Sequence, residues 1–274
     1  MPGPWFQALP PIAQAALAGA LTWLLTALGA AVVCTRQRLG AKALDAMLGF
    51  AAGVMLAASI WSLLAPALRL AAAGAGGGRG APLVGFLAGL LVLRGVDRLL
   101  PHLHADVGGG HLEGVRTSWR RSTLLLTAIT LHHIPEGLAL GVAFGAAALP
   151  RGLADGASLS AALALTLGLG VQNIPEGMAV AMPLRREGMS PLRSFGLGQL
   201  SAAIEPFAAA VGAAAVLVIG GLLPYALGFA AGAMIYVIAE ALLPEVRGSG
   251  HSDTATLATG IGFAFMTALS LWLG

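Results

Sequence analysis

The hexapeptide His132-His133-Ile134-Pro135-Glu136-Gly137 lies inside a long apolar stretch, and Gln172-Asn173-Ile174-Pro175-Glu176-Gly177 repeats its last four residues further along the chain. A carboxylate at the centre of a membrane helix costs about 2.5–3.5 kcal/mol on insertion scales, so such residues usually face a polar cavity or a bound cation. In each hexapeptide the first and fifth residues are four apart, which on a helix places both side chains on one face. The two strings therefore predict two helices, each with a polar face whose carboxylate needs a compensating charge.

The composition of the whole chain indicates a membrane protein. With 57% hydrophobic and 10% charged residues and a mean hydropathy of +0.85, it is far more apolar than a soluble protein. No period-two alternation of the kind found in transmembrane barrels runs through it. A helix needs about 20 residues to cross the hydrocarbon core, and eight apolar runs are this long: 12–34, 43–68, 81–101, 122–147, 158–184, 194–220, 222–245 and 254–273. The sequence predicts an all-α integral membrane protein, a single transmembrane domain over residues 1–274 with eight spanning helices.

The basic residues fall mainly on one side of the expected bundle. The richer loops hold Arg36, Arg38, Lys42, Arg94, Arg98, Arg116, Arg120, Arg121, Arg185, Arg186, Arg193 and Arg247, and the other side holds Arg69, Arg79 and Arg151. By the positive-inside rule the richer side is cytoplasmic, so we expect a multi-pass protein of the inner (plasma) membrane with both termini outside the cytoplasm. The net charge of +3 reflects this topology, and we expect no nucleic-acid partner.

An internal repeat predicts the order of the helices. The segment Leu48-Gly49-Phe50-Ala51-Ala52-Gly53 recurs as Leu227-Gly228-Phe229-Ala230-Ala231-Gly232. The two copies fall on the second and seventh expected helices, which run in opposite directions, so the repeat is inverted. The Pro-Glu-Gly helices lie between two groups of three, a 3+2+3 arrangement. Many secondary transporters have such inverted repeats, with the substrate site near the midplane where helices are broken.

Proline breaks each of the two central helices. Because Pro135 and Pro175 have no N–H, the carbonyls of Leu131 and Val171 lose their usual helical partners. Within a bilayer, such carbonyls are tolerated only where protein, water or a cation satisfies them. The alternative is that each Pro-Glu-Gly merely kinks its helix while the Glu bonds to a neighbouring helix. Two copies, each preceded by a potential metal ligand, favour a cation site.

With these motifs the sequence resembles the ZIP (Zrt-, Irt-like) family of divalent metal transporters, and within it the bacterial GufA-like branch. The resemblance implies a binuclear metal site between the fourth and fifth helices, zinc uptake toward the cytoplasm, and a homodimer. It implies a first metal position formed by Met55, His132, Glu136, Gln172 and Glu176. It implies a second position formed by His133, Asn173, Glu205 and the shared Glu136 and Glu176.

The ligand types support zinc independently of the resemblance. Imidazole with carboxylate suits Zn²⁺, whereas an all-oxygen cage would have favoured Mg²⁺ or Ca²⁺. Other transported ions of this class would be Cd²⁺, Fe²⁺, Mn²⁺ and Co²⁺. The chain departs from the family pattern at His133, where Asn is usual, at Asn173, where some relatives have Asp, and at Ala239-Glu240, where many have His-Glu. Glu240 is expected either to pass metal between the site and one exit or to bond to another helix.

The segment 102–121 is the longest expected cytoplasmic loop, and it contains His102, His104 and His111 among glycines. Short His-rich tracts can bind metal, so this loop either captures released cations or is a solvated linker.

Other functions remain open at this point. A metal-selective channel or a metal sensor of the same fold would have the same motifs. An intramembrane metallohydrolase is less favoured, because it would usually need a His-Glu-x-x-His helix, which the sequence lacks. We therefore expect a transporter and no enzyme.

Overall fold

A computed structural model of the chain describes residues 3–35, 40–74, 76–99, 102–103, 112–113, 121–149, 158–242 and 251–273. His104 and His111 of the expected cytoplasmic loop lie outside these residues, as do several of the basic residues used for the topology.

The described chain is built almost entirely of helices, which confirms the predicted all-α class. Its first part contains α1 (Pro4–Gln7), α2 (Pro11–Ala30) with the 3-10 turn η1 (Ala31–Cys34), α3 (Ala41–Ala57), η2 (Ala58–Leu64), α4 (Ala65–Ala72) and α5 (Ala81–Leu99). Its second part contains α6 (Arg121–Ala147), α7 (Leu159–Arg186), α8 (Pro191–Leu200), α9 (Glu205–Val218), η3 (Gly220–Leu222), α10 (Leu223–Val237), η4 (Ile238–Leu242) and α12 (Ser252–Leu273). The strands β1 (His102–Leu103) and β2 (Leu112–Glu113) form a single antiparallel pair.

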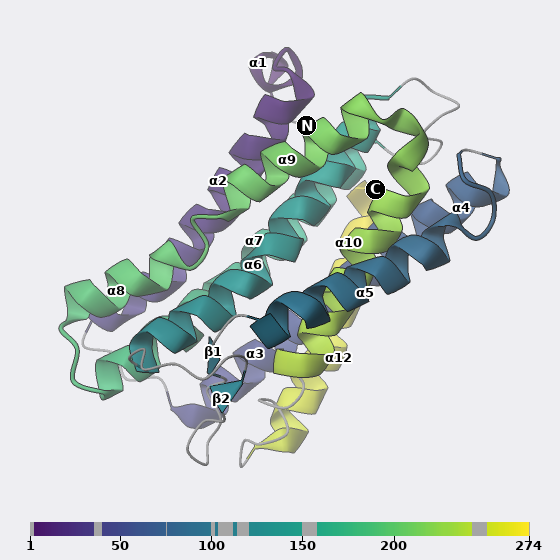
Figure 1. Cartoon of the computed structure of the whole chain (residues 1–274). Coiled ribbons are helices and arrows are strands. Elements are labelled where there is room, and N and C mark those ends of the chain that lie inside the picture. The colour runs from purple at the N-terminus through teal and green to yellow at the C-terminus, as the bar shows by residue number, and fades with distance from the viewer. Residues whose placement is uncertain are drawn as a thin grey trace.

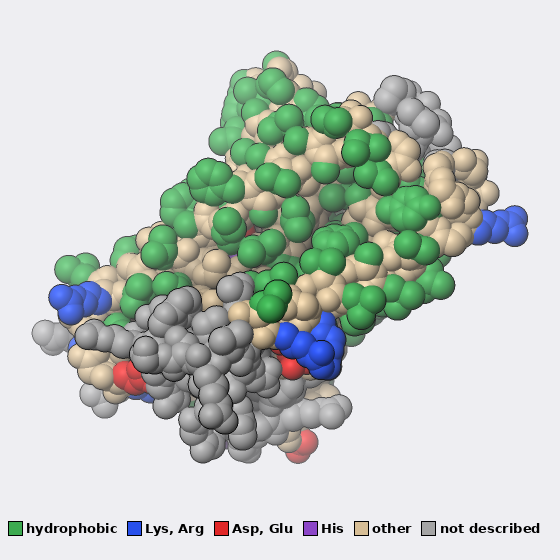
Figure 2. Space-filling view, in the orientation of Figure 1, with side chains coloured by type: hydrophobic (Ala, Val, Ile, Leu, Met, Phe, Trp, Pro, Cys, Tyr) green, Lys and Arg blue, Asp and Glu red, His purple; other side chains and the backbone are tan. Residues whose placement is uncertain are grey.

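Several helical segments are long and apolar enough to cross a membrane. Among the described residues there are 5 of them: Pro11–Cys34, Ala41–Ala72, Pro191–Val218, Leu223–Glu240 and Ser252–Leu273. Hydrophobic side chains are spread over the upper and middle part of the face seen in Figure 2, and Lys and Arg lie toward the ends of the bundle. The chain is therefore a multi-pass membrane protein, as the composition predicts.

The long helices α5 and α7 are not among those segments, because they are more polar. The last turns of α5 contain Arg94, Asp97 and Arg98, and the middle of α7 contains Gln172, Asn173 and Glu176. These polar residues of α7 are largely or fully buried. The helix is thus stabilised by what it contacts inside the protein more than by contact with lipid.

The repeated glycines lie at two close helix contacts. A Cβ on any of them would lie 2.0 to 2.3 Å from a carbonyl oxygen of the facing helix. Gly49 and Gly53 of α3 face Ala255 and Thr259 of α12, and Gly228 and Gly232 of α10 face Pro82 and Phe86 of α5. In both copies a π-helical stretch soon follows the glycines, η2 after α3 and η4 after α10. Small residues let helix backbones approach this closely in membranes.

Both chain ends lie toward one end of the bundle, and the β1–β2 pair lies toward the other (Figure 1). α6 and α7 pass through the middle of the bundle, with α2 and α9 on one flank and α10 and α5 on the other. The two helices that carry the Pro-Glu-Gly strings therefore lie largely within the protein, although Leu167 and Val171 of α7 are exposed.

Candidate metal centre

The centre begins with a histidine held between two carboxylates. His133 and Glu136 lie one turn apart on α6, on either side of Pro135, and Glu205 is the first residue of α9. His133 Nδ1 lies 2.7 Å from Glu205 Oε1 and 3.2 Å from Glu136 Oε2. The exposed fractions of these three side chains are 0 to 1%. A polar group so deeply buried is costly unless it is paired, and these three groups pair with one another.

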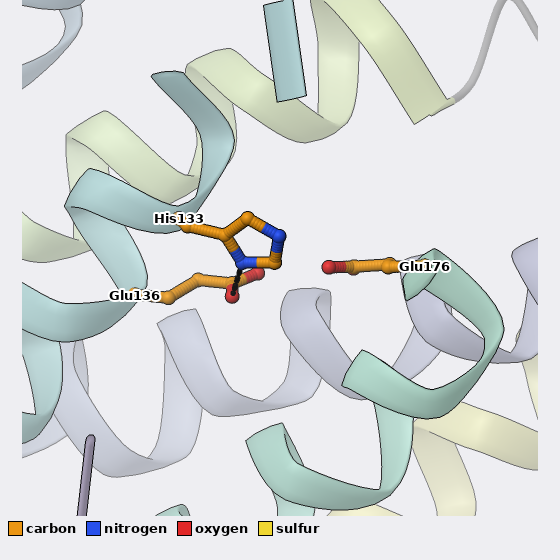
Figure 3. A group of neighbouring side chains, drawn as sticks. All are labelled: His133, Glu136 and Glu176. Carbon is orange, nitrogen blue, oxygen red and sulfur yellow. Dashed lines mark hydrogen bonds and ion pairs between the residues drawn. The ribbon is translucent and has the colours of Figure 1, made fainter. Parts of the chain in front are cut away.

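Glu176 of α7 completes a cluster able to hold a cation. One ligand atom from each of His133, Glu136 and Glu176 lies within 4.8 Å of the other two. Figure 3 shows His133 and Glu136 extending from one helix and Glu176 from another, with their ends directed toward a common centre. Donor atoms bound to Zn²⁺ lie about 2.0–2.2 Å from it, so small side-chain rotations would bring all three onto one ion.

Two amide side chains of α7 tie the carboxylates together. Gln172 Nε2 donates to Glu136 Oε1 at 2.8 Å, and Asn173 Nδ2 donates to Glu205 Oε1 at 2.9 Å. Both amides are fully buried. α7 thus supplies hydrogen-bond donors to one carboxylate from α6 and to one from α9, which fixes where both carboxylates lie.

Within this cluster, the polar atoms His133 Nε2, Gln172 Oε1 and Asn173 Oδ1 have no hydrogen-bond partner among the described residues. Buried polar atoms are rarely left unpaired, and each exception calls for an explanation. With Nδ1 donating to a carboxylate, Nε2 of the neutral His133 ring carries a lone pair. Metal-binding histidines commonly donate their other ring N–H to a carboxylate in this way. All three atoms can therefore act as metal ligands.

The charges of the cluster also favour a cation. Glu136, Glu176 and Glu205 bring three carboxylates against the single imidazole of His133, in a region shielded from solvent. Like charges in a buried site repel one another strongly. A divalent ion would offset this repulsion, which a buried hydrogen-bond network alone offsets only in part.

Thr22 of α2 is a part of the site that the sequence analysis missed. Its hydroxyl donates to Glu205 Oε2, and its main-chain carbonyl accepts a hydrogen bond of 3.4 Å from Asn173 Nδ2. Thr22 and Thr26 are both fully buried and four residues apart in a largely apolar helix. That spacing was the available signal, but buried threonines often bond only to their own helix, as Thr26 Oγ1 does to the Thr22 carbonyl at 3.2 Å.

Two other predicted site residues lie in a small adjoining pocket. His132 of α6 and Glu240 of η4 line it together with Asp97 and Tyr236. Tyr236 Oη donates to Asp97 Oδ2 at 2.8 Å, which joins α10 to α5 on this side. Met55 is fully buried in the core of α3, where its carbonyl accepts from Ser59 Oγ at 2.8 Å.

The structure therefore brings together His133, Glu136, Gln172, Asn173, Glu176 and Glu205, and it places His132 beside Glu240 in the small pocket that both line. The two adjacent histidines point to different groups because neighbouring residues of a helix lie on different faces.

Comparison with known proteins gives one family. Residues 104–270 match the family described as ZIP Zinc transporter. The chain is 38% identical to the zinc transporter ZIP11 of Bos taurus, over 96% of this chain and 98% of that protein. It is 38% identical to the zinc transporter ZIPB of Bordetella bronchiseptica, over 96% of this chain and 82% of that protein. It is 37% identical to the zinc transporter GufA of Myxococcus xanthus, over 94% and 98% respectively.

Proposed function

Because this chain belongs to the ZIP family of zinc transporters, as its motifs predicted, we propose that it carries Zn²⁺ across the membrane toward the cytoplasm. The observation that carries the proposal is a buried cluster of His133, Glu136, Glu176 and Glu205. Its first three residues come from α6 and α7, which run continuously through Pro135 and Pro175, where the sequence predicts a break. Its similar proteins are named as zinc transporters. The chain is thus a metal transporter, and we expect it to catalyse no covalent reaction.

We assign two metal positions to the centre. His132, Glu136, Gln172, Glu176 and Met55 would form the first, and His133, Asn173, Glu205 and the shared glutamates the second. The second is supported by the orphaned Nε2 of His133 and Oδ1 of Asn173 beside Glu205. Glu240, beside His132, would receive an ion that leaves the first position. Imidazole and amide ligands would also admit Cd²⁺, Fe²⁺, Mn²⁺ or Co²⁺.

The proposed architecture has eight membrane-spanning helices in a 3+2+3 inverted repeat. The matching glycine contacts of α3 with α12 and of α10 with α5 support the repeat, as do the π-helical stretches η2 and η4 that follow them. Two chain ends at the same end of the bundle are consistent with an even number of crossings (Figure 1). We place both termini outside the cytoplasm of the plasma membrane and expect a homodimer.

Zinc uptake by purified protein in sealed lipid vesicles tests the function. We expect uptake of radioactive zinc that saturates as the zinc concentration rises, because each ion must occupy a finite binding site before it crosses. Uptake that rises linearly with concentration would identify a channel, and zinc binding without uptake a sensor. Vesicles made without protein give the background, and zinc uptake no higher than this background would contradict the prediction.

Zinc should also stabilise the detergent-purified protein against heat. A ligand that binds only the folded state adds about 2.7 kcal/mol of stability at 100 times its Kd. We therefore expect the Tm to rise on adding ZnCl₂ and to return to its starting value on adding a chelator. MgCl₂ is the control, since Mg²⁺ prefers an all-oxygen site. An equal shift with both salts would mean that the ions act through general salt effects.

A further inference from the structure

We propose that Thr22 of α2 is a positioning residue that holds the Glu205 carboxylate in place for the metal. The inference rests on the proposed zinc site. It adds to that site a residue that lies on a different helix from any of the expected ligands and that is not itself a metal ligand.

The hydrogen bonds of Glu205 use both of its oxygens. Oε1 lies 2.7 Å from His133 Nδ1 and accepts from Asn173 Nδ2 at 2.9 Å. Oε2 accepts from the hydroxyl of Thr22. Without that hydroxyl, Oε2 would keep none of these hydrogen bonds, in a side chain whose exposed fraction is 0%. Thr22 therefore determines the rotation of the Glu205 carboxylate about the Cγ–Cδ bond of its side chain.

The backbone at Glu205 makes such an anchor necessary. The chain leaves α8 at Leu200, makes a turn over residues 201–204 and enters α9 at Glu205, which puts Glu205 where the spanning helix is interrupted. An interrupted helix fixes a side chain less well than a continuous one. α2 packs directly on this interruption, since a Cβ on Gly19 would lie 2.9 Å from the Glu205 carbonyl. Thr22 is one turn further along the same face.

Thr22 can also release the carboxylate when metal arrives. Its hydroxyl has one hydrogen to donate but two acceptors within reach, Glu205 Oε2 and the Gly19 carbonyl oxygen at 3.0 Å. In the metal-free site the hydrogen points to the charged oxygen, because hydrogen bonds to charged groups are the stronger ones. When Oε2 turns to a cation, the hydrogen moves to Gly19 and the hydroxyl stays paired.

Replacing Thr22 by Val tests this role, because Val keeps the shape and removes the hydroxyl. Loss of a residue that orients a metal ligand typically lowers metal affinity about 10- to 100-fold. We expect Thr22→Val to raise the Kd for zinc, by calorimetry on the full-length protein, and the KM for uptake by such a factor. Thr22→Ser, which keeps the hydroxyl, should restore the parental values. Thr22→Ala should behave as Val does and replaces it if the Val variant does not fold.

Thr166→Val is the matched control. Thr166 is a buried threonine of α7 whose hydroxyl bonds to the Ala162 carbonyl of its own helix at 2.8 Å. Its removal should leave zinc Kd and KM unchanged. A second control combines Thr22→Val with Glu205→Gln: if Thr22 acts through the charge of Glu205, the double variant binds zinc as weakly as Glu205→Gln alone.

The outcomes separate this proposal from the proposed function. Parental protein that binds no zinc would overturn both. Parental protein that binds zinc, with Thr22→Val binding equally well or Thr22→Ser as weak as Val, would overturn the role of Thr22 alone. An additive loss in the Thr22→Val, Glu205→Gln double variant would likewise show that Thr22 does not act through Glu205.

Discussion

Replacing Glu176 by alanine is expected to reduce zinc uptake to the background of protein-free vesicles. Glu176 is one of the three residues whose ligand atoms converge on the centre, and both proposed metal positions use it. Alanine removes a charge and a ligand from each position at once, so neither can compensate for the other. Initial rates of radioactive zinc uptake, normalised to the protein in each vesicle preparation, give the measurement.

Glu187→Ala is the control for this loss. Glu187 lies on the same chain segment, at the C-terminal cap of α7, and is exposed. Its removal should leave uptake at the parental rate. Asn173→Ala should give an intermediate result, because Asn173 serves only the second position: uptake continues, with altered preference among Zn²⁺, Cd²⁺ and Mn²⁺. Parental uptake by Glu176→Ala would refute the shared role.

Replacing Gly29 by alanine is expected to destabilise the protein severely. A Cβ at Gly29 of α2 would lie 1.9 Å from the carbonyl oxygen of Ile174, the residue before Pro175 on α7. That is far closer than two such atoms can approach, so α2 and α7 must separate. Overpacking of this kind typically costs about 1–3 kcal/mol. We expect a lower Tm of the purified protein and weaker zinc binding, since Glu176 lies only two residues beyond Ile174.

Gly260→Ala in α12 is the comparison for this prediction. Gly260 is also helical, but no heavy atom of another segment lies within 4 Å of a Cβ placed there. Alanine is a better helix former than glycine, so this variant should keep the parental Tm or exceed it. If both glycine variants had the same Tm as the parent, the close contact of α2 with α7 would not exist in the membrane protein.

The helical class and the presence of polar residues on α6 and α7 could be predicted from the sequence because both depend on local pattern. Apolar runs of sufficient length give membrane helices, and the order His-x-x-x-Glu or Gln-x-x-x-Glu on a helix gives one polar face. The meeting of Glu136 with Gln172 and of Asn173 with Glu205 followed from the family resemblance, since nothing local in the sequence fixes which helices touch.

Thr22 and the two π-helical stretches show what the sequence could not give. The hydrogen bond from Thr22 to Glu205 joins residues far apart in the chain. A threonine in an apolar helix often bonds only to a carbonyl of its own helix, so its presence alone does not indicate a distant partner. η2 and η4 lie inside apolar runs that predict uninterrupted helices, because hydropathy is insensitive to a change from i→i+4 to i→i+5 bonding. Which of two adjacent histidines faces the carboxylates is likewise decided by the rotation of α6 within the bundle.

The polarity of α7 has a consequence for how the protein is made. A segment with two amides and a carboxylate at its centre gains little free energy when it enters lipid by itself. Its insertion into the bilayer therefore depends on helices that are already there. α2 emerges from the ribosome first and offers the face against which α7 packs closely, at Gly29 of α2 and, through the Thr26 carbonyl, at Gly177 of α7. We therefore expect membrane insertion of α7 and assembly of the ion-binding centre to be coupled, so that a substitution which disturbs the α2–α7 contact lowers the amount of folded protein as well as its transport.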